Sequence, residues 1–88
     1  MDQTFLHLRR LGLAEYEARV YGALLAHSPA SATYIAKKCT LSRSSVYTTL
    51  SSLIAKGLVG TTYKNDVKQF IVEDLAALET MLERERAM

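Results

Sequence analysis

The hydrophobic pattern predicts four successive helices in the first two thirds of the chain. Apolar residues recur there at three- and four-residue intervals, and glycine, proline or a capping serine separates one run from the next. Ser31 and Ser42 are good N-caps for the third and fourth helices, and Gly57 ends the fourth. The expected helices cover about residues 2–10, 14–27, 32–39 and 42–56.

After Gly57 the pattern becomes that of a β-hairpin. Two runs, at about residues 58–63 and 68–72, are rich in Val, Ile, Thr, Tyr and Phe, and Asn65-Asp66 lies between them. Asn and Asp tolerate the positive φ of a tight hairpin turn. A last helix is expected from residue 73 to about 87, with an acidic first turn and a stripe of leucines.

The fourth predicted helix has a polar face without acidic residues. At about 100° per residue, Val46, Leu50 and Leu53 fall in one narrow sector, and small hydroxyl side chains fill the opposite one. No Asp or Glu occurs between residues 42 and 56, whereas an exposed helix face normally carries mixed charges. This face suits the major groove of DNA, where Ser and Thr donate to phosphates or base edges and Arg43 can reach guanine or a phosphate. A merely polar, solvated face is the alternative.

The third and fourth helices, joined by a turn at Thr40-Leu41, form a helix-turn-helix, whose second helix enters the groove N-terminus first. The hairpin is then a wing with a polar, lysine-flanked tip that fits the DNA backbone or the minor groove; solvated wing lysines are the alternative. The expected DNA-binding residues are Ser31, Thr33, Lys37, Lys38, Ser42, Arg43, Ser44, Ser45, Tyr47, Thr48, Ser51, Lys64, Asn65 and Lys68.

Charge is distributed unevenly along a chain of ordinary globular composition. Of its 88 residues, 49% are hydrophobic and 23% charged. Residues 1–72 carry nine basic and four acidic side chains, a net charge of +5, whereas residues 73–88 carry two and five, a net charge of −3. A basic body with an acidic end suggests that one face meets a polyanion while another does something else.

The segments "LGLAEYEARVYGALL" and "SATYIAKKCTLSRSSVYTTLSSLIAKGLV" resemble the DNA-binding domain of TrmB-like winged-helix transcriptional regulators. The resemblance covers roughly residues 11–60 and includes Ser42-Arg43, Val46-Tyr47 and the run from Lys56 to Val59. It implies a prokaryotic, cytoplasmic protein that binds specific DNA sequences as a dimer, with the helix that carries Arg43 in the groove and the wing on the flanking backbone. The expected fold is mainly α (α+β), a winged helix-turn-helix with a two-stranded wing and a C-terminal dimerisation helix.

Two features depart from the family pattern. Ala14 stands where the second helix normally has a Ser or Thr N-cap, so that helix starts frayed or is capped in another way. Larger members also carry a sugar-binding effector domain, whereas this chain ends after one further predicted helix. Sugar sensing is therefore not carried over, and no small-molecule effector is expected.

We expect a single domain, with residues 1–72 as the DNA-binding part and residues 73–88 as a dimer contact. The last helix has too few usable heptads to be stable alone, so it packs on the first helix of its own chain or on a partner. We favour a homodimer, because two-fold symmetry places two recognition helices on one face of DNA. The expected interface residues are Phe5, Leu8, Leu75, Leu78, Met81 and Leu82.

Other chemistry receives little support from the sequence. His7 and His27 have no carboxylate or cysteine at ligand spacing, so neither a metal site nor a cofactor is expected. No nucleophile motif or phosphate loop is present, and no apolar run approaches the roughly 18 residues of a membrane span. We therefore expect a protein that is not an enzyme and has no membrane partner.

Three alternatives stay open at this stage. Cys39 is expected to be a buried core thiol, with a redox switch as the alternative. Tyr47 either packs against the wing or offers its hydroxyl to a phosphate. The whole domain could instead be a winged-helix protein-interaction module within a larger complex, since fold does not dictate function.

Overall fold

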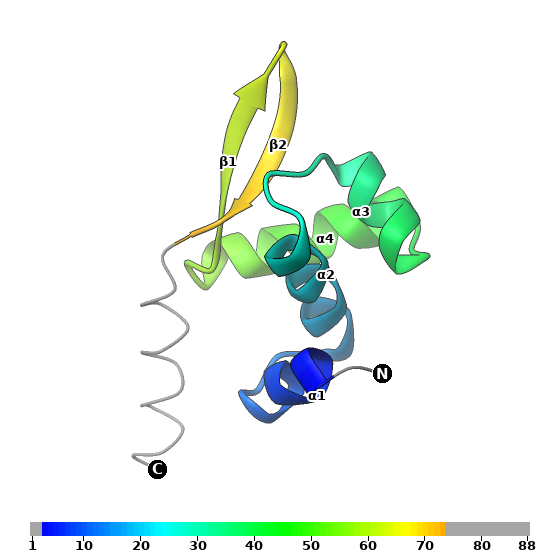
Figure 1. Ribbon diagram of the computed structural model, residues 1–88, viewed down its shortest axis with the longest axis vertical. Helices are drawn as coiled ribbons and strands as arrows, with labels where there is room; N and C mark the ends of the chain where they lie inside the picture. The colour runs from blue at the N-terminus through cyan, green and yellow to red at the C-terminus, as the bar shows by residue number, and fades with distance from the viewer. Residues whose placement is uncertain (1–2, 74–88) are drawn as a thin grey trace.

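The computed structural model describes residues 3–73, and its elements follow the predicted order (Figure 1). The predicted helix from residue 73 to 87 lies outside the described residues, except for Glu73, which is not helical. The helices lie within about a residue of their expected bounds. The elements are α1 (Gln3–Arg10), α2 (Glu15–Ala26), α3 (Ala32–Cys39), α4 (Arg43–Ala55), β1 (Val59–Lys64) and β2 (Val67–Val72).

Capping residues fix the ends of the helix-turn-helix. The hydroxyls of Ser31 and Ser42 accept the backbone N–H of Tyr34 at 3.1 Å and of Ser45 at 3.2 Å, so both predicted N-caps are confirmed. At the far end of α4, Gly57 takes a φ of 78°, as a C-terminal glycine does.

The hairpin is antiparallel, with Val59 opposite Val72 at its base and Lys64 opposite Val67 next to the turn. Asn65 and Asp66 form the turn with φ values of 52° and 64°, which confirms the expected positive φ at both positions. Figure 1 shows the hairpin projecting from one end of the helical body, while α1 lies at the other end.

A short backbone pairing joins the hairpin to the helix-turn-helix. Ala30, just before α3, donates its N–H to the Phe70 carbonyl at 3.0 Å and accepts the Phe70 N–H at 2.7 Å. Ser28 adds a contact, because its hydroxyl accepts the Val72 N–H at 3.2 Å. The base of the wing is therefore fixed relative to the start of α3.

The core surrounds α2, which contacts α1, α3, α4 and β2. Leu8 of α1 is 1% exposed and belongs to this core, so little of its side chain is left for the dimer interface in which the sequence places it. The turn at Gly12 folds α1 back on α2 with Leu8 inward, and it leaves Leu6 on the outside at 49% exposure. Phe5 is half-buried and packs against the core. The largest fully buried side chains are Tyr21, Phe70, Leu8, Leu13, Leu24, Ile35, Leu50, Leu53, Leu58, Val20 and Val46.

Candidate nucleic-acid interface

The polar face of α4 is exposed in the described structure, while its apolar side enters the core. Val46, Leu50 and Leu53 are buried, as their spacing predicts, together with Thr49. Arg43 and the hydroxyl-bearing side chains of Ser44, Thr48 and Ser51 are exposed. Small exposed side chains without acidic neighbours on the same helix let its backbone approach another surface closely.

The N-terminus of α4 carries a cluster of serine hydroxyls. Ser42 caps the helix, and its hydroxyl lies 3.2 Å from that of Ser44 and 2.9 Å from that of Ser45. The unpaired N–H groups and the dipole at a helix N-terminus favour a negatively charged partner such as phosphate. This end of α4 can therefore receive an anionic backbone.

Hydrogen bonds within α4 decide which of its hydroxyls can still donate a hydrogen bond to a ligand and which can only accept one. Thr48 donates to the Ser44 carbonyl at 3.0 Å, which leaves its oxygen as an acceptor and its methyl group for apolar contact. The Ser51 hydroxyl makes no hydrogen bond within the described residues and can both donate and accept. Thr48 lies beside a hollow of about 270 Å³ that Tyr16 of α2 also lines. Tyr16 is 43% exposed and was not among the predicted residues.

Tyr47 packs against the wing, which is the first of the two alternatives left open by the sequence, and its hydroxyl contacts Arg43. Its ring meets Phe70 of β2 edge-on at a centroid distance of 6.3 Å, so it packs against the wing. Its hydroxyl accepts a hydrogen bond from Arg43 Nη2 at 3.3 Å and is exposed on the outer side of α4. The structure thus joins Arg43, Tyr47 and the wing.

The wing exposes Lys64, Asn65 and Lys68, as expected. It also exposes two apolar residues, Tyr63 at 68% and Val67 at 51%, which sequence reasoning missed. Tyr63 pairs with Lys68, and this pair continues the face of the sheet that carries Phe70. The alternation of apolar residues along the strands could have indicated this exposure. It continues beyond the part of the hairpin that packs on the core, so the last residue on the core-facing side of the sheet, Tyr63, stays uncovered.

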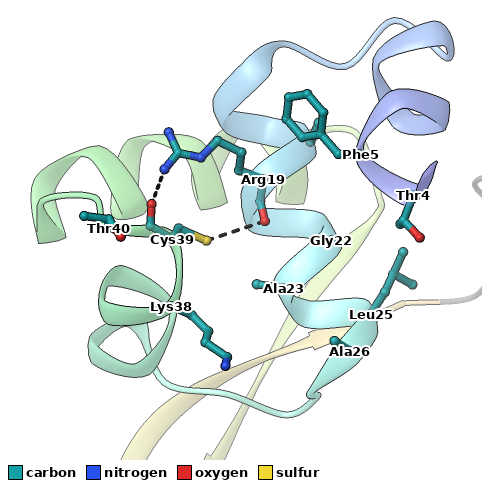
Figure 2. A pocket seen from close by; sticks show the side chains of 11 residues that line it. Thr4, Phe5, Arg19, Gly22, Ala23, Leu25, Ala26, Lys38, Cys39 and Thr40 are labelled. Carbon is teal, nitrogen blue, oxygen red and sulfur yellow. Dashed lines mark hydrogen bonds between the residues drawn. The ribbon is translucent and has the colours of Figure 1, made fainter. Parts of the chain in front are cut away.

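The predicted residues of α3 are divided between two surfaces. Ser31 is a half-buried cap, while Thr33 and Lys37 are exposed. Lys38 lines a pocket of about 680 Å³ between α1, α2 and α3 (Figure 2). No residue of α4 or of the hairpin lines this pocket, so the structure does not bring Lys38 together with the polar face of α4.

Lys56 is held away from this surface by an ion pair. Its ammonium group lies 2.8 Å from both carboxylate oxygens of Glu17 on α2, which also accepts a hydrogen bond from the Ser52 hydroxyl. Glu17 is 6% exposed. The positive charge of Lys56 is therefore compensated, and the basic character of the interface depends on Arg43 and the wing lysines.

Cys39 is buried, as predicted, at the end of α3. Its thiol donates to the Arg19 carbonyl at 3.5 Å, and Arg19 in turn donates to the Cys39 carbonyl (Figure 2). Burial raises the pKa of the Cys39 thiol, and the nearby Arg19 charge offsets part of that rise. The neutral thiol that results is a poor nucleophile.

Residues 3–73 offer neither a metal centre nor a membrane span. In that range, His, Cys, Asp and Glu side chains form no group of three that could hold a metal ion. Nor does any helix of that range have the length and apolar character needed to cross a membrane.

The comparisons with solved structures define a winged helix-turn-helix protein. TrmBL2, described as an archaeal chromatin protein that shows a novel mode of DNA binding, is 26% identical with a TM-score of 0.80 over 98% of this chain and 34% of that one. The MarR family transcriptional regulator SPO1453 from Silicibacter pomeroyi DSS-3 is 26% identical with a TM-score of 0.68, over 92% of this chain and 60% of that one.

Sequence comparison then gives the family. Residues 8–85 match the family described as "Sugar-specific transcriptional regulator TrmB", and the chain belongs to this family. It is 40% identical over 58 residues to the uncharacterized protein YrhO of Bacillus subtilis (strain 168). That match covers 66% of this chain and 21% of YrhO, so the chain spans about a fifth of that curated relative.

Proposed function

We propose that this protein is a transcriptional regulator that binds specific sequences of double-stranded DNA. The recognition helix, residues 42–56, enters the major groove, and the wing, residues 58–72, contacts the flanking backbone or the minor groove. The observation that carries the proposal is the exposed face of α4, which bears Arg43 and small hydroxyls and no acidic residue. Membership of a family of transcriptional regulators supports it, and so does the DNA binding described for TrmBL2.

The contacts divide into two kinds. Arg43 and the hydroxyls of Thr48 and Ser51 face outward where a helix in the major groove meets base edges, so they supply specificity. Lys64 and Lys68 flank the wing turn and make no ion pair within the described residues, so they supply affinity through phosphates. Nothing in this scheme requires catalysis or a cofactor, and the protein acts by occupying its site in the prokaryotic cytoplasm, on the nucleoid.

The homodimer is the second part of the proposal. The pocket between α1, α2 and α3 has an apolar lining, including Phe5 and Leu25, and two cations, Arg19 and Lys38, but no acidic residue. A neighbouring hollow shares Thr4 and Leu25 with it and is also lined by Leu6 and Arg10. The sequence 74–88 is complementary, since it carries Leu75, Leu78, Met81 and Leu82 among four acidic residues. We propose that this segment of one copy covers the α1–α2 face of the other.

The test of DNA binding is a fluorescence-anisotropy titration against duplexes selected from a random library, at several salt concentrations. We expect the logarithm of the association constant to fall with the logarithm of salt concentration, with a slope of several units per dimer. Arg43→Ala should relax base preference at one position per half-site by about 1–3 kcal/mol. Lys64→Ala should weaken binding to all sequences alike and reduce the salt slope.

Two results would contradict the proposal. A salt slope near zero would remove the electrostatic basis, and identical behaviour of the two variants would refute the division of contacts. A stoichiometric protein partner captured without any retention on DNA would instead favour the interaction-module alternative.

A further inference from the structure

Arg43 and Tyr47 lie one turn apart at the exposed beginning of α4 and contact each other directly. Arg43 Nη2 donates to the Tyr47 hydroxyl at 3.3 Å, and the guanidinium carbon lies 5.7 Å from the centroid of the Tyr47 ring. The hydrogen bond uses one of the five guanidinium N–H groups. The remaining donors can still form the paired hydrogen bonds with which Arg reads the edge of a guanine.

Tyr47 is itself held by the wing. Its ring meets the Phe70 ring at an interplanar angle of 73°, and Phe70 is 2% exposed and bonded through its backbone to Ala30. On the wing, Lys68 Nζ lies 5.7 Å from the centroid of the Phe70 ring. A cation, two aromatic rings and a second cation thus connect the N-terminus of α4 with the wing.

This arrangement bears on what a DNA contact costs. An exposed Arg side chain loses rotamer entropy when it is fixed on a base. A side chain that is already held in one orientation loses less entropy on binding. If that orientation fits one base, binding to that base is favoured without any added contact. The fixed point here is Phe70, which is buried in the core and paired through its backbone with Ala30.

We propose that Tyr47 is a positioning residue for Arg43. Its hydroxyl holds the guanidinium in the orientation that reads a base, and its ring sets that orientation relative to the wing. This inference rests on the proposed function, because it requires that Arg43 face DNA, but it goes further by assigning Tyr47 an indirect role in specificity and no direct contact with phosphate.

The test is a double-mutant cycle with Arg43→Ala, Tyr47→Phe and the combined variant. Phe removes only the hydroxyl and keeps the ring contacts with Phe70 and the Arg43 guanidinium, so the thermal unfolding temperature should not change. We expect Tyr47→Phe to lower discrimination at the same base position as Arg43→Ala, by about two- to tenfold, the range of one hydrogen bond. Affinity for unrelated duplexes and the salt slope should stay the same, and adding Tyr47→Phe to Arg43→Ala should cause no further loss.

Tyr34→Phe is the matched control, because Tyr34 is not among the proposed DNA contacts, its ring stays stacked on His27, and its hydroxyl makes no hydrogen bond within the described residues. It should leave discrimination at the Arg43 position unchanged. Equal losses on all sequences, or losses that add to those of Arg43→Ala, would show that the Tyr47 hydroxyl binds DNA itself and would overturn the inference. So would an unchanged base preference in Tyr47→Phe. If the unmodified protein bound no duplex, the proposed function would fall first.

Discussion

Glu17 connects three parts of the fold through one carboxylate. It accepts the backbone N–H of Ala14 at 2.8 Å, the Lys56 ammonium at 2.8 Å and the Ser52 hydroxyl. The first contact caps α2 in the absence of a Ser or Thr at position 14, so the differently capped alternative is the one observed. The other two connect α2 to the C-terminal end of α4.

The pKa of Glu17 makes this network testable. Burial alone raises the pKa, but hydrogen bonds from Lys56, Ser52 and Ala14, with the Lys56 charge, lower it below the ordinary value of 4.5. Since the folded pKa is the lower one, the carboxylate stabilises the fold above pH 4.5, and this contribution is lost as the pH falls through the folded pKa. In Glu17→Gln, the free energy of unfolding measured with urea should therefore fall less between neutral and acidic pH than in the unmodified protein.

At neutral pH we expect Glu17→Gln to cost about 1–2 kcal/mol of unfolding free energy. The cost stays below that of breaking a fully buried pair, because the Lys56 side chain is 39% exposed and remains solvated. Glu15→Gln is the control, since Glu15 is exposed on the same turn and forms no ion pair within the described residues. Parallel pH curves for the unmodified protein and Glu17→Gln would contradict the assignment.

At the scale of elements, local signals predicted most of what was observed. Ser31, Ser42 and Gly57 mark helix ends by hydrogen bonding and backbone freedom that depend on neighbouring residues only, and α3 and α4 begin and end near those marks. Asn65-Asp66 set the hairpin register for the same reason. The polar face of α4 followed from helical periodicity.

Contacts between distant segments were not predictable in this way. The pairing of Ala30 with Phe70, the capture of Lys56 by Glu17 and the inward turn of Leu8 each depend on how elements meet in space. Thr40 lies in the predicted turn, but its left-handed φ of 55°, which glycine or asparagine usually adopts, was not predicted. The site was therefore predicted as a helix face and a wing, but not as a surface connected through Tyr47 and Phe70.

The hairpin turn provides a prediction at this scale. Asn65→Ala should destabilise the wing by about 1 kcal/mol. Alanine is strained at positive φ, and it lacks the short polar side chain with which asparagine can stabilise that conformation by local hydrogen bonds. Asn65→Gly should not, since glycine adopts that conformation freely. Hydrogen exchange of the β1 and β2 amides would measure the difference, while α2 amides report on the core. Equal protection in the two variants would mean that the turn does not hold the wing.

At the scale of the molecule, the two ends carry different surfaces. The wing and the start of α4 form a basic and aromatic surface, and α1 lies at the opposite end of the view in Figure 1. Leu6 of α1 and Leu25 of α2 are exposed and line the same hollow. A dimer formed through α1 and the acidic segment 74–88 would leave the wing of each copy free to bind DNA. With two-fold symmetry, two recognition helices about 34 Å apart would then meet successive turns of one DNA face.

Leu6→Gln tests that arrangement. Leu6 is 49% exposed, so covering its side chain stabilises the contact by about 1 kcal/mol. Two-fold symmetry places Leu6 of both copies in the contact, so the substitution removes this contribution twice. The dimer dissociation constant, measured by sedimentation equilibrium, should rise roughly 30-fold, the equivalent of about 2 kcal/mol. Val67→Gln, an equally exposed apolar position on the wing, should leave it unchanged. A monomeric unmodified protein would refute the homodimer, and an unaffected dimer in Leu6→Gln would place the contact elsewhere. If the contact is right, Leu6→Gln should weaken binding to a full two-fold site while binding to an isolated half-site persists, because the wing and α4 of each copy remain intact.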